Sequence, residues 1–138
     1  MGKVHYIDEG VGRPILFLHG NPTWSFLYRG IVIRLRQKFR CIAVDYPGFG
    51  LSVRPEDYDY TPREHAGIVR DLVRSLDLRD LTIMGHDWGG PIGMRVAVDE
   101  LPAAPITPAR DPERRSALRD SLTRVNERHG ESLKRLAE

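Results

Sequence analysis

The sequence contains a single cysteine, Cys41, so no disulfide can form within the chain. Cys41 lies in the apolar stretch Phe39–Val44, which favours a buried structural thiol over a reactive one. The chain also lacks an apolar run of the ~18 residues that a membrane-spanning helix requires, and it shows no signal-peptide pattern. These absences predict a soluble, cytoplasmic protein.

Neither sign of charge dominates, because 21 Lys and Arg stand against 19 Asp and Glu. The net charge of +2 therefore gives no support for a nucleic-acid partner. The histidines show no His-x-x-x-His spacing, so no metal site is predicted. The glycine-rich loop around Gly48 lacks the spacing of a phosphate-binding loop, so it is interpreted as a structural turn and no cofactor is predicted.

Short apolar segments alternate with amphipathic ones along the first hundred residues. Strands are predicted at residues 4–7, 14–18, 40–45 and 81–84. Helices are predicted at residues 24–37, from Thr61 to Leu76, and at residues 89–98. This order is typical of an α/β fold, with a mostly parallel sheet of about four strands and flanking helices.

Two helix starts carry specific signals. Thr23 is expected to cap the first helix, whose apolar stripe is predicted to contain Phe26, Leu27, Ile31 and Leu35. The second helix begins at the sequence Thr-Pro-Arg-Glu from Thr61, which combines a capping threonine, a proline at the first position and a glutamate at the third.

Residues 85–89 read Gly-His-Asp-Trp-Gly and have the spacing of a nucleophile elbow. In this motif a strand turns sharply into a helix and exposes one side chain, and the flanking glycines leave room where strand and helix backbones meet. The exposed residue here is Asp87, whose carboxylate can displace a leaving group from saturated carbon and form an ester. A plain strand-helix turn with an aspartate cap is the alternative interpretation.

Ligands of open α/β sheets bind beyond the carboxyl ends of the strands. The loops expected at that edge are those around Asn21, Gly48 and Asp87, and Asp45 is expected to hydrogen-bond the Gly48 turn. The unusual polar residues of the chain therefore converge on one rim of the predicted sheet.

Three stretches resemble the α/β-hydrolase superfamily and, within it, the haloalkane dehalogenases. They are His-Gly-Asn-Pro-Thr-Trp at residues 19–24, Val-Asp-Tyr-Pro-Gly-Phe-Gly-Leu-Ser at residues 44–52 and the elbow at residues 85–90. The resemblance covers about residues 4–98. Epoxide hydrolases share the aspartate nucleophile, and the asparagine after His-Gly favours the dehalogenases.

The resemblance implies a hydrolase that cleaves carbon–halogen bonds of small halogenated alkanes through an alkyl ester on Asp87. It also implies that the Asn21 side chain and the Trp88 indole bind the departing halide. The backbone N–H groups of Asn21 and Trp88 would form the oxyanion hole. The alternatives are a turn residue for Asn21 and a core aromatic for Trp88.

The sequence after the elbow departs from the family pattern of a helical cap, a catalytic acid and a histidine. Residues 1–100 are interpreted as a partial hydrolase core, residues 101–112 as a Pro- and Ala-rich linker, and residues 113–138 as an amphipathic helical tail. The apolar stripe of this tail contains Leu118, Leu122, Val125, Leu133 and Leu136.

His129, the only histidine after the elbow, lies in that polar tail, so no base and no acid are assigned. Full turnover by this chain alone is therefore not expected. A non-catalytic fragment with an interaction helix is the alternative outside enzymology. The elbow strand is expected to leave an unpaired sheet edge, which predicts self-association.

Overall fold

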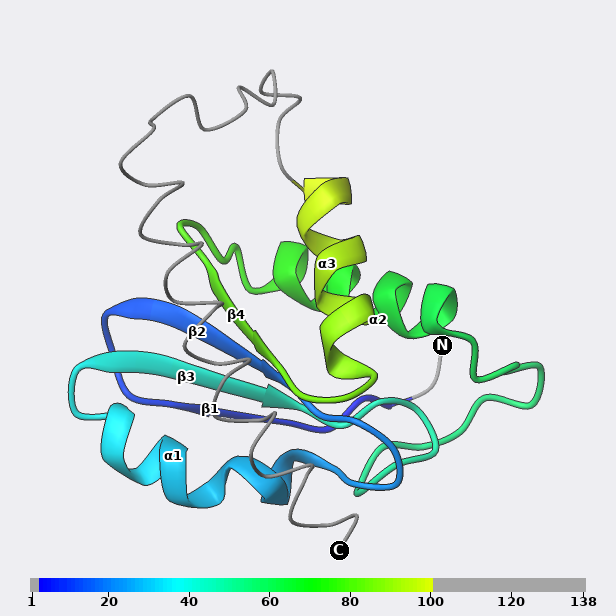
Figure 1. The fold of residues 1–138 in the computed structure, drawn as a ribbon, viewed down its shortest axis with the longest axis horizontal. Helices are drawn as coiled ribbons and strands as arrows, with labels where there is room; N and C mark the ends of the chain where they lie inside the picture. The colour runs from blue at the N-terminus through cyan, green and yellow to red at the C-terminus, as the bar shows by residue number, and fades with distance from the viewer. Residues whose placement is uncertain (1–2, 101–138) are drawn as a thin grey trace, which may run out of the picture. The chain divides into compact units, whose positions relative to one another are not determined.

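The computed structural model describes residues 3–100, and these form one sheet covered by helices on both faces (Figure 1). Its four strands lie in the order β1-β3-β2-β4. β2, β3 and β4 are parallel, whereas β1 runs antiparallel to β3. The strand bounds are Tyr6–Glu9 for β1, Arg13–Leu18 for β2, Phe39–Val44 for β3 and Thr82–Gly85 for β4. The predicted mostly parallel α/β fold is confirmed.

Helices cover the two faces of the sheet unequally. One face carries α1 (Arg29–Leu35), which continues a 3₁₀ turn, η1 (Ser25–Tyr28). The other face carries α2 (Pro62–Ser75) and α3 (Gly89–Glu100), which pack against each other (Figure 1). The chain therefore alternates strand and helix as the sequence pattern indicates.

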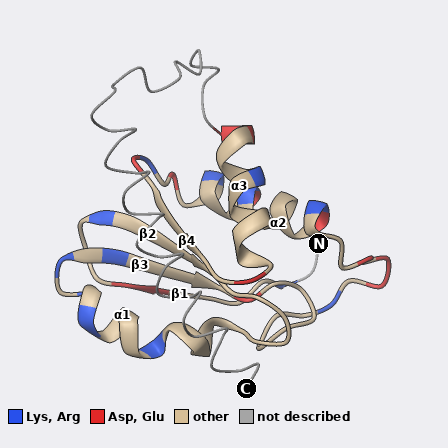
Figure 2. Ribbon diagram, viewed as in Figure 1, with Lys and Arg blue, Asp and Glu red and all other residues tan. Residues whose placement is uncertain are grey.

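The central strands β2 and β3 are buried on both faces, which explains their nearly continuous apolar sequences. Leu16 and Leu18 pack toward α2 and α3, whereas Phe17 packs toward Tyr28 and Val32 of the opposite layer. Lys, Arg, Asp and Glu lie mainly on helices, loops and strand starts (Figure 2). Complete burial of a side chain such as Leu16, Phe17 or Leu18 stabilises the fold by about 1.5–3 kcal/mol.

Two details of the first helix were predicted wrongly. Thr23 does not cap it: the threonine hydroxyl donates to the Gly20 carbonyl, and the helix starts as a 3₁₀ turn after Trp24. The buried side chains are Tyr28 and Val32. Because a 3₁₀ turn has about three residues rather than 3.6, it shifts the phase of the helix and turns the predicted stripe outward. The exposed members of that stripe are Phe26, Leu27 and Ile31.

The first strand lies later in the chain than predicted, since it begins at Tyr6 and includes Asp8 and Glu9, which were assigned to the following turn. β1 is an edge strand of the sheet, and Asp8 pairs with Arg40 of the neighbouring strand β3, whereas Glu9 pairs with Arg36 at the C-terminal end of α1. These ion pairs stabilise an extended conformation in residues that the sequence pattern assigns to a turn.

Two other local predictions are confirmed. The Thr61 side chain accepts a hydrogen bond from the Glu64 backbone N–H at 3.2 Å and caps α2. Cys41 is fully buried, and burial raises the pKa of its thiol above the ordinary value. This thiol is therefore structural rather than reactive.

Within residues 3–100, β4 forms one edge of the sheet. The self-association predicted for that edge stays a prediction, as does the cytoplasmic location. The linker at 101–112, the helical tail at 113–138 and His129 lie outside the described residues. No helix in the described part of the chain has the length and hydropathy needed to cross a membrane.

Candidate active site

The turn between β4 and α3 has the geometry of a nucleophile elbow. Asp87 lies at its tip with a φ of 54°, in the left-handed region that non-glycine residues seldom adopt. A Cβ at Gly89 would collide with the carbonyl oxygen of Leu18, and one at Gly85 would lie 2.5 Å from the Gly89 oxygen. The two glycines are therefore required by the close approach of strand and helix, as the sequence predicts.

The Asp87 carboxylate is exposed, and one of its oxygens is held by the backbone. Oδ1 accepts a hydrogen bond from the Asn21 backbone N–H at 3.1 Å. The backbone N–H groups of Trp88 and then of Asn21 hold the pKa of Asp87 below its ordinary value. The side chain is thus ionised near neutral pH, and its Oδ1 is held by the Asn21 loop.

The Asn21 loop is anchored beneath Asp87 through Gly20. A Cβ on Gly20 would collide with the Asp87 side chain. The Gly20 carbonyl accepts hydrogen bonds from the backbone N–H and the hydroxyl of Thr23, at 3.1 and 3.0 Å. Nδ1 of His19 also donates to it, at 2.8 Å. These contacts fix the loop that carries the Asn21 N–H.

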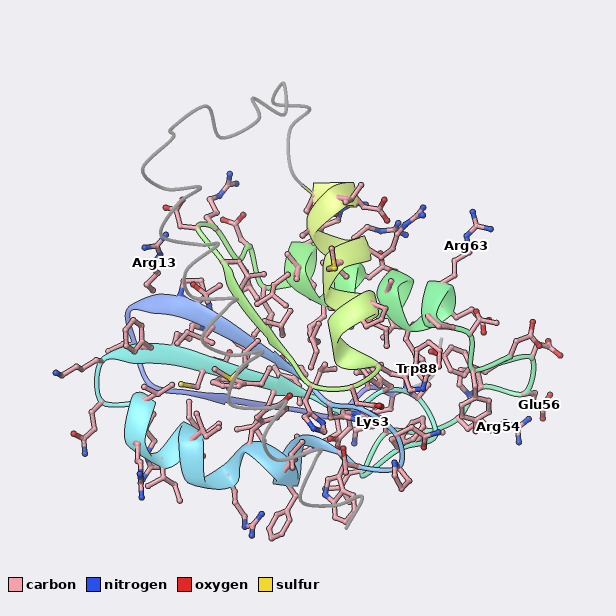
Figure 3. All side chains as sticks on the ribbon, in the orientation of Figure 1. Lys3, Arg13, Arg54, Glu56, Arg63 and Trp88 are labelled. Atoms are coloured by element: carbon pink, nitrogen blue, oxygen red, sulfur yellow. The ribbon has the colours of Figure 1, made fainter. Side chains whose placement is uncertain are left out.

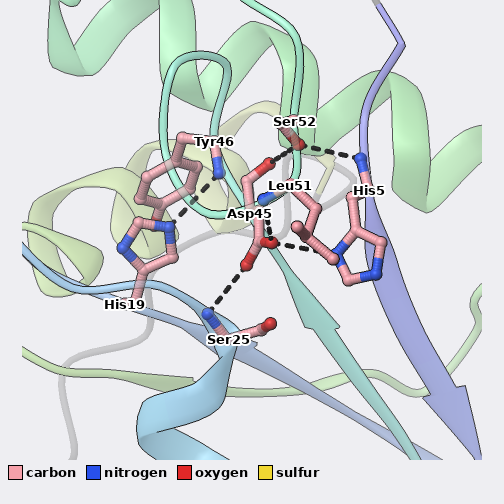
Figure 4. Close-up of polar contacts among 7 residues, drawn as sticks. All are labelled: His5, His19, Ser25, Asp45, Tyr46, Leu51 and Ser52. Carbon is pink, nitrogen blue, oxygen red and sulfur yellow. Dashed lines mark hydrogen bonds and ion pairs between the residues drawn. The ribbon is translucent and has the colours of Figure 1, made fainter.

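His19 is held as a neutral imidazole. Its Nδ1 donates to a carbonyl, and its Nε2 accepts the Tyr46 backbone N–H at 3.2 Å, which defines the tautomer (Figure 4). Burial lowers the pKa of His19. The ring therefore supports the loops and has no free nitrogen with which to act as a base at Asp87.

Asp45 connects the Gly48 loop to the start of η1, which follows the Asn21 loop (Figure 4). Its Oδ1 accepts the Ser25 N–H at 2.8 Å, and its Oδ2 accepts the Leu51 N–H at 3.0 Å and lies 2.9 Å from His5 Nδ1. The Ser52 hydroxyl donates to the Asp45 carbonyl. The predicted hydrogen bond to the Gly48 turn is confirmed, and the carboxylate also fixes the start of η1.

Asp45 should make the stability of the fold depend on pH. Burial alone would raise the pKa of this carboxyl, but hydrogen bonds from Leu51, Ser25 and His5 hold it below the ordinary value of 3.8. A carboxyl with a lowered folded-state pKa stabilises the fold above its unfolded pKa, and this stabilisation is lost as pH falls through the folded pKa. Asp45→Asn should therefore cost about 2–4 kcal/mol at about pH 7 and less at about pH 3.

Urea unfolding at the two pH values measures this difference. Asp59→Asn, at an exposed position, is the matched control and should change the free energy of unfolding little at either pH. An Asp45→Asn cost of equal size at both pH values would contradict a stabilising role for the ionised carboxylate.

A cavity of about 340 Å³ opens at the carboxyl end of the sheet. Asn21 and Trp88, which flank Asp87, lie in its wall, and Trp88 is half exposed at the start of α3 (Figure 3). The remaining wall is mostly aromatic and apolar: Gly20, Tyr46, Phe49, Tyr60, Pro62, His65 and Ile92. The structure thus brings together the three site residues predicted from sequence.

His65 and Tyr60 were not predicted as wall residues. Tyr60 lies just before α2 and His65 in its first turn, both far in the chain from the elbow. Tyr60 has a φ of 58°, which is a strained backbone conformation for a non-glycine residue. Its ring lies against Gly48. The helix start at Thr61, which places His65 in the first turn of α2, was the available signal.

The pattern of the alpha/beta hydrolase fold family matches residues 13–106. The chain belongs to this family. It is 57% identical over 98 residues to haloalkane dehalogenase 2 of Mycobacterium tuberculosis, a match that covers 71% of this chain and 34% of that protein. The chain thus spans about a third of the length of the curated relatives it matches.

Proteins of this fold that are named for other activities are also similar to the chain. A cis-3-alkyl-4-alkyloxetan-2-one decarboxylase of Shewanella oneidensis is 46% identical over 98 residues, covering 69% of this chain and 31% of that protein. A mutant of a Bacillus megaterium epoxide hydrolase, solved with its diol product, has a TM-score of 0.65 at 32% identity, with 70% of this chain and 34% of that one covered. The relatives have different activities, so similarity alone does not decide which reaction this chain performs. That question depends on the residues of the site.

Proposed function

We propose that Asp87 displaces halide from a small halogenated alkane and forms an alkyl ester, as in haloalkane dehalogenases. The observation that carries the proposal is the exposed Asp87 carboxylate, held through Oδ1 by the Asn21 N–H beside a mostly apolar cavity. In this step the free carboxylate oxygen bonds to carbon while the carbon–halogen bond breaks, and the halide departs with the bonding electrons.

The departing anion needs donors that are not paired with acceptors of their own. The Asn21 side chain and the Trp88 indole N–H are the proposed halide ligands, since both residues lie in the cavity wall. The backbone N–H groups of Asn21 and Trp88 are the proposed oxyanion hole. Their effect on the pKa of Asp87 supports this role, because donors that stabilise a carboxylate also stabilise a negative oxygen at the same place.

Hydrolysis of the ester requires a base, and none of the described histidines is hydrogen-bonded to Asp87. His19 uses both ring nitrogens on the backbone, His5 pairs with Asp45, and His65 pairs with Tyr58. His86 precedes Asp87 in the chain, but its exposed side chain makes no hydrogen bond to that carboxylate. The ester is therefore expected to accumulate on this chain rather than turn over.

Bromide binding tests the two proposed halide ligands. Bromide should quench Trp88 fluorescence in a saturable way, and Asn21→Ala should weaken the apparent affinity about tenfold by removing one donor to an anion. The measurement requires a Trp24→Phe background, because Trp24 is also exposed, at 44%. The affinity should be low, since an open site leaves water to compete for the donors.

Asn21→Asp should abolish the saturable quenching, because a second carboxylate repels the anion. Equal quenching of Asn21→Ala and its parent would assign Asn21 to the turn alone.

The epoxide hydrolase reaction is the second candidate, favoured by the shared aspartate nucleophile and the structural similarity to the Bacillus megaterium enzyme. Ring opening requires an acid to protonate the epoxide oxygen. Stoichiometric alkylation by bromoalkanes without alkylation by the corresponding epoxides separates the two reactions.

A further inference from the structure

His65 lies in the wall of the cavity but takes no part in the proposed displacement. It occupies the first turn of α2 and is only 6% exposed. Its ring packs against Tyr46, with centroids 4.6 Å apart, and against Phe49 at 5.9 Å. A polar ring is thus inserted among aromatic side chains at the edge of a mostly apolar cavity.

One nitrogen of this ring is already paired. Nδ1 of His65 lies 2.6 Å from the Tyr58 hydroxyl, which is itself buried. Burial lowers the pKa of His65 to about 4 and raises that of Tyr58, so both groups are neutral near pH 7. A phenol is a better proton donor than a neutral imidazole, so the Tyr58 O–H donates to Nδ1 and the imidazole proton resides on Nε2.

Nε2 makes no hydrogen bond to another residue within 3–100, and it is not closed off from solvent. A donor at a cavity wall that is satisfied only by water can exchange that water for an acceptor on a ligand. Because Asn21, Trp88 and His65 line the same cavity, a ligand bound there with its reactive carbon toward Asp87 can reach His65 and its aromatic neighbours with its other end.

The geometry points to the Nε2–H of His65 as a specificity-determining donor that selects haloalkanes with an acceptor oxygen, an ether or a carbonyl, along the chain. This inference rests on the proposed reaction of Asp87. It assigns the polar end of the ligand to His65, whereas the halide end belongs to Asn21 and Trp88.

The test compares Asp87 alkylation by bromoalkanes with alkylation by bromoethers of equal length, in which the oxygen is moved along the chain. The ratio of the ether rate to the alkane rate is measured for the unsubstituted chain and for His65→Phe, so that intrinsic reactivity cancels. For the best oxygen position, His65→Phe should lower this ratio about fivefold or more. Tyr58→Phe should lower the ratio of ether rate to alkane rate by a smaller factor. This change removes the hydrogen bond to Nδ1 of His65, so that the imidazole proton is shared between Nδ1 and Nε2.

Val69→Ala is the matched control, because Val69 is fully buried on the same helix but is not in the cavity wall. It should leave the ratio unchanged. An unchanged ratio in folded His65→Phe would overturn the inference while leaving the reaction of Asp87 intact.

A binding measurement on the unmodified protein covers the case in which His65→Phe does not fold or Asp87 does not react. In ¹⁵N-histidine spectra, a non-reactive diether should shift the Nε2 resonance of His65 at concentrations where the alkane of equal length does not. Equal shifts, or none, would overturn the inference. Absence of alkylation together with the ether-specific shift would refute the proposed reaction alone.

Discussion

A reactive bromoalkane is expected to add one alkyl group to this 138-residue chain and to release one equivalent of bromide. The Asp87 carboxylate is exposed and ionised, its Oδ1 is held by the Asn21 N–H, and no described histidine is hydrogen-bonded to it. Ester formation should therefore proceed, and its hydrolysis should not. Intact-mass spectrometry and halide titration on the same sample measure the two stoichiometries.

Asp87→Asn should lower the alkylation rate more than about a thousandfold, because a neutral amide does not displace halide. Asp80→Asn is a close control, since Asp80 is also exposed and has a φ of 51° beside the 54° of Asp87. The Asp80→Asn variant should be alkylated at the same rate as the unsubstituted chain. Sustained bromide release beyond one equivalent would contradict the expectation that no histidine among residues 3–100 acts as a base at Asp87.

The second large effect is expected from the two adjacent glycines at the start of α3. A Cβ at Gly89 would collide with the backbone oxygen of Leu18, whereas a Cβ at Gly90 would meet no atom within 4 Å. Gly89→Ala should therefore lower the free energy of unfolding by about 3 kcal/mol or more, because the Leu18 backbone belongs to the central strand β2 and cannot yield. It should also displace Asp87 and slow alkylation.

Gly90→Ala is the matched control. Alanine is the better helix former, so this change should leave stability unaltered or raise it by up to about 1 kcal/mol. Urea unfolding of the two variants beside the parent provides the comparison. Equal stability of Gly89→Ala and Gly90→Ala would show that the elbow is not as tightly packed as the structure has it.

Much of the sheet could be predicted because its signals are local. The buried strands β2 and β3 are continuous apolar runs, and Thr61 caps α2 through a side chain three residues from its partner. The elbow was also predictable, since the spacing of Gly85, Asp87 and Gly89 encodes the tight turn. These features depend on neighbours in the sequence.

The features that were missed depend on contacts between distant residues or on the phase of a single turn. β1 extends over Asp8 and Glu9 because Arg40 and Arg36 face them from other elements. The η1 turn rotates the apolar stripe of the first helix, which periodicity alone does not reveal. His65 reached the cavity wall through the packing of α2 beside the elbow helix α3, and the helix start at Thr61 predicts the helix but not this position in the wall.

The most direct test of the account is a tryptic map of the protein after reaction with a bromoalkane. The peptide from Asp80 to Arg95 contains two carboxylates, Asp80 and Asp87, and the nucleophilic side chains of His86 and the methionines. Fragment ions should place a single alkyl group on Asp87, as an ester that alkali removes. An adduct on Asp80, His86 or a methionine, with Asp87 unmodified, would contradict the assignment of Asp87 as the nucleophile.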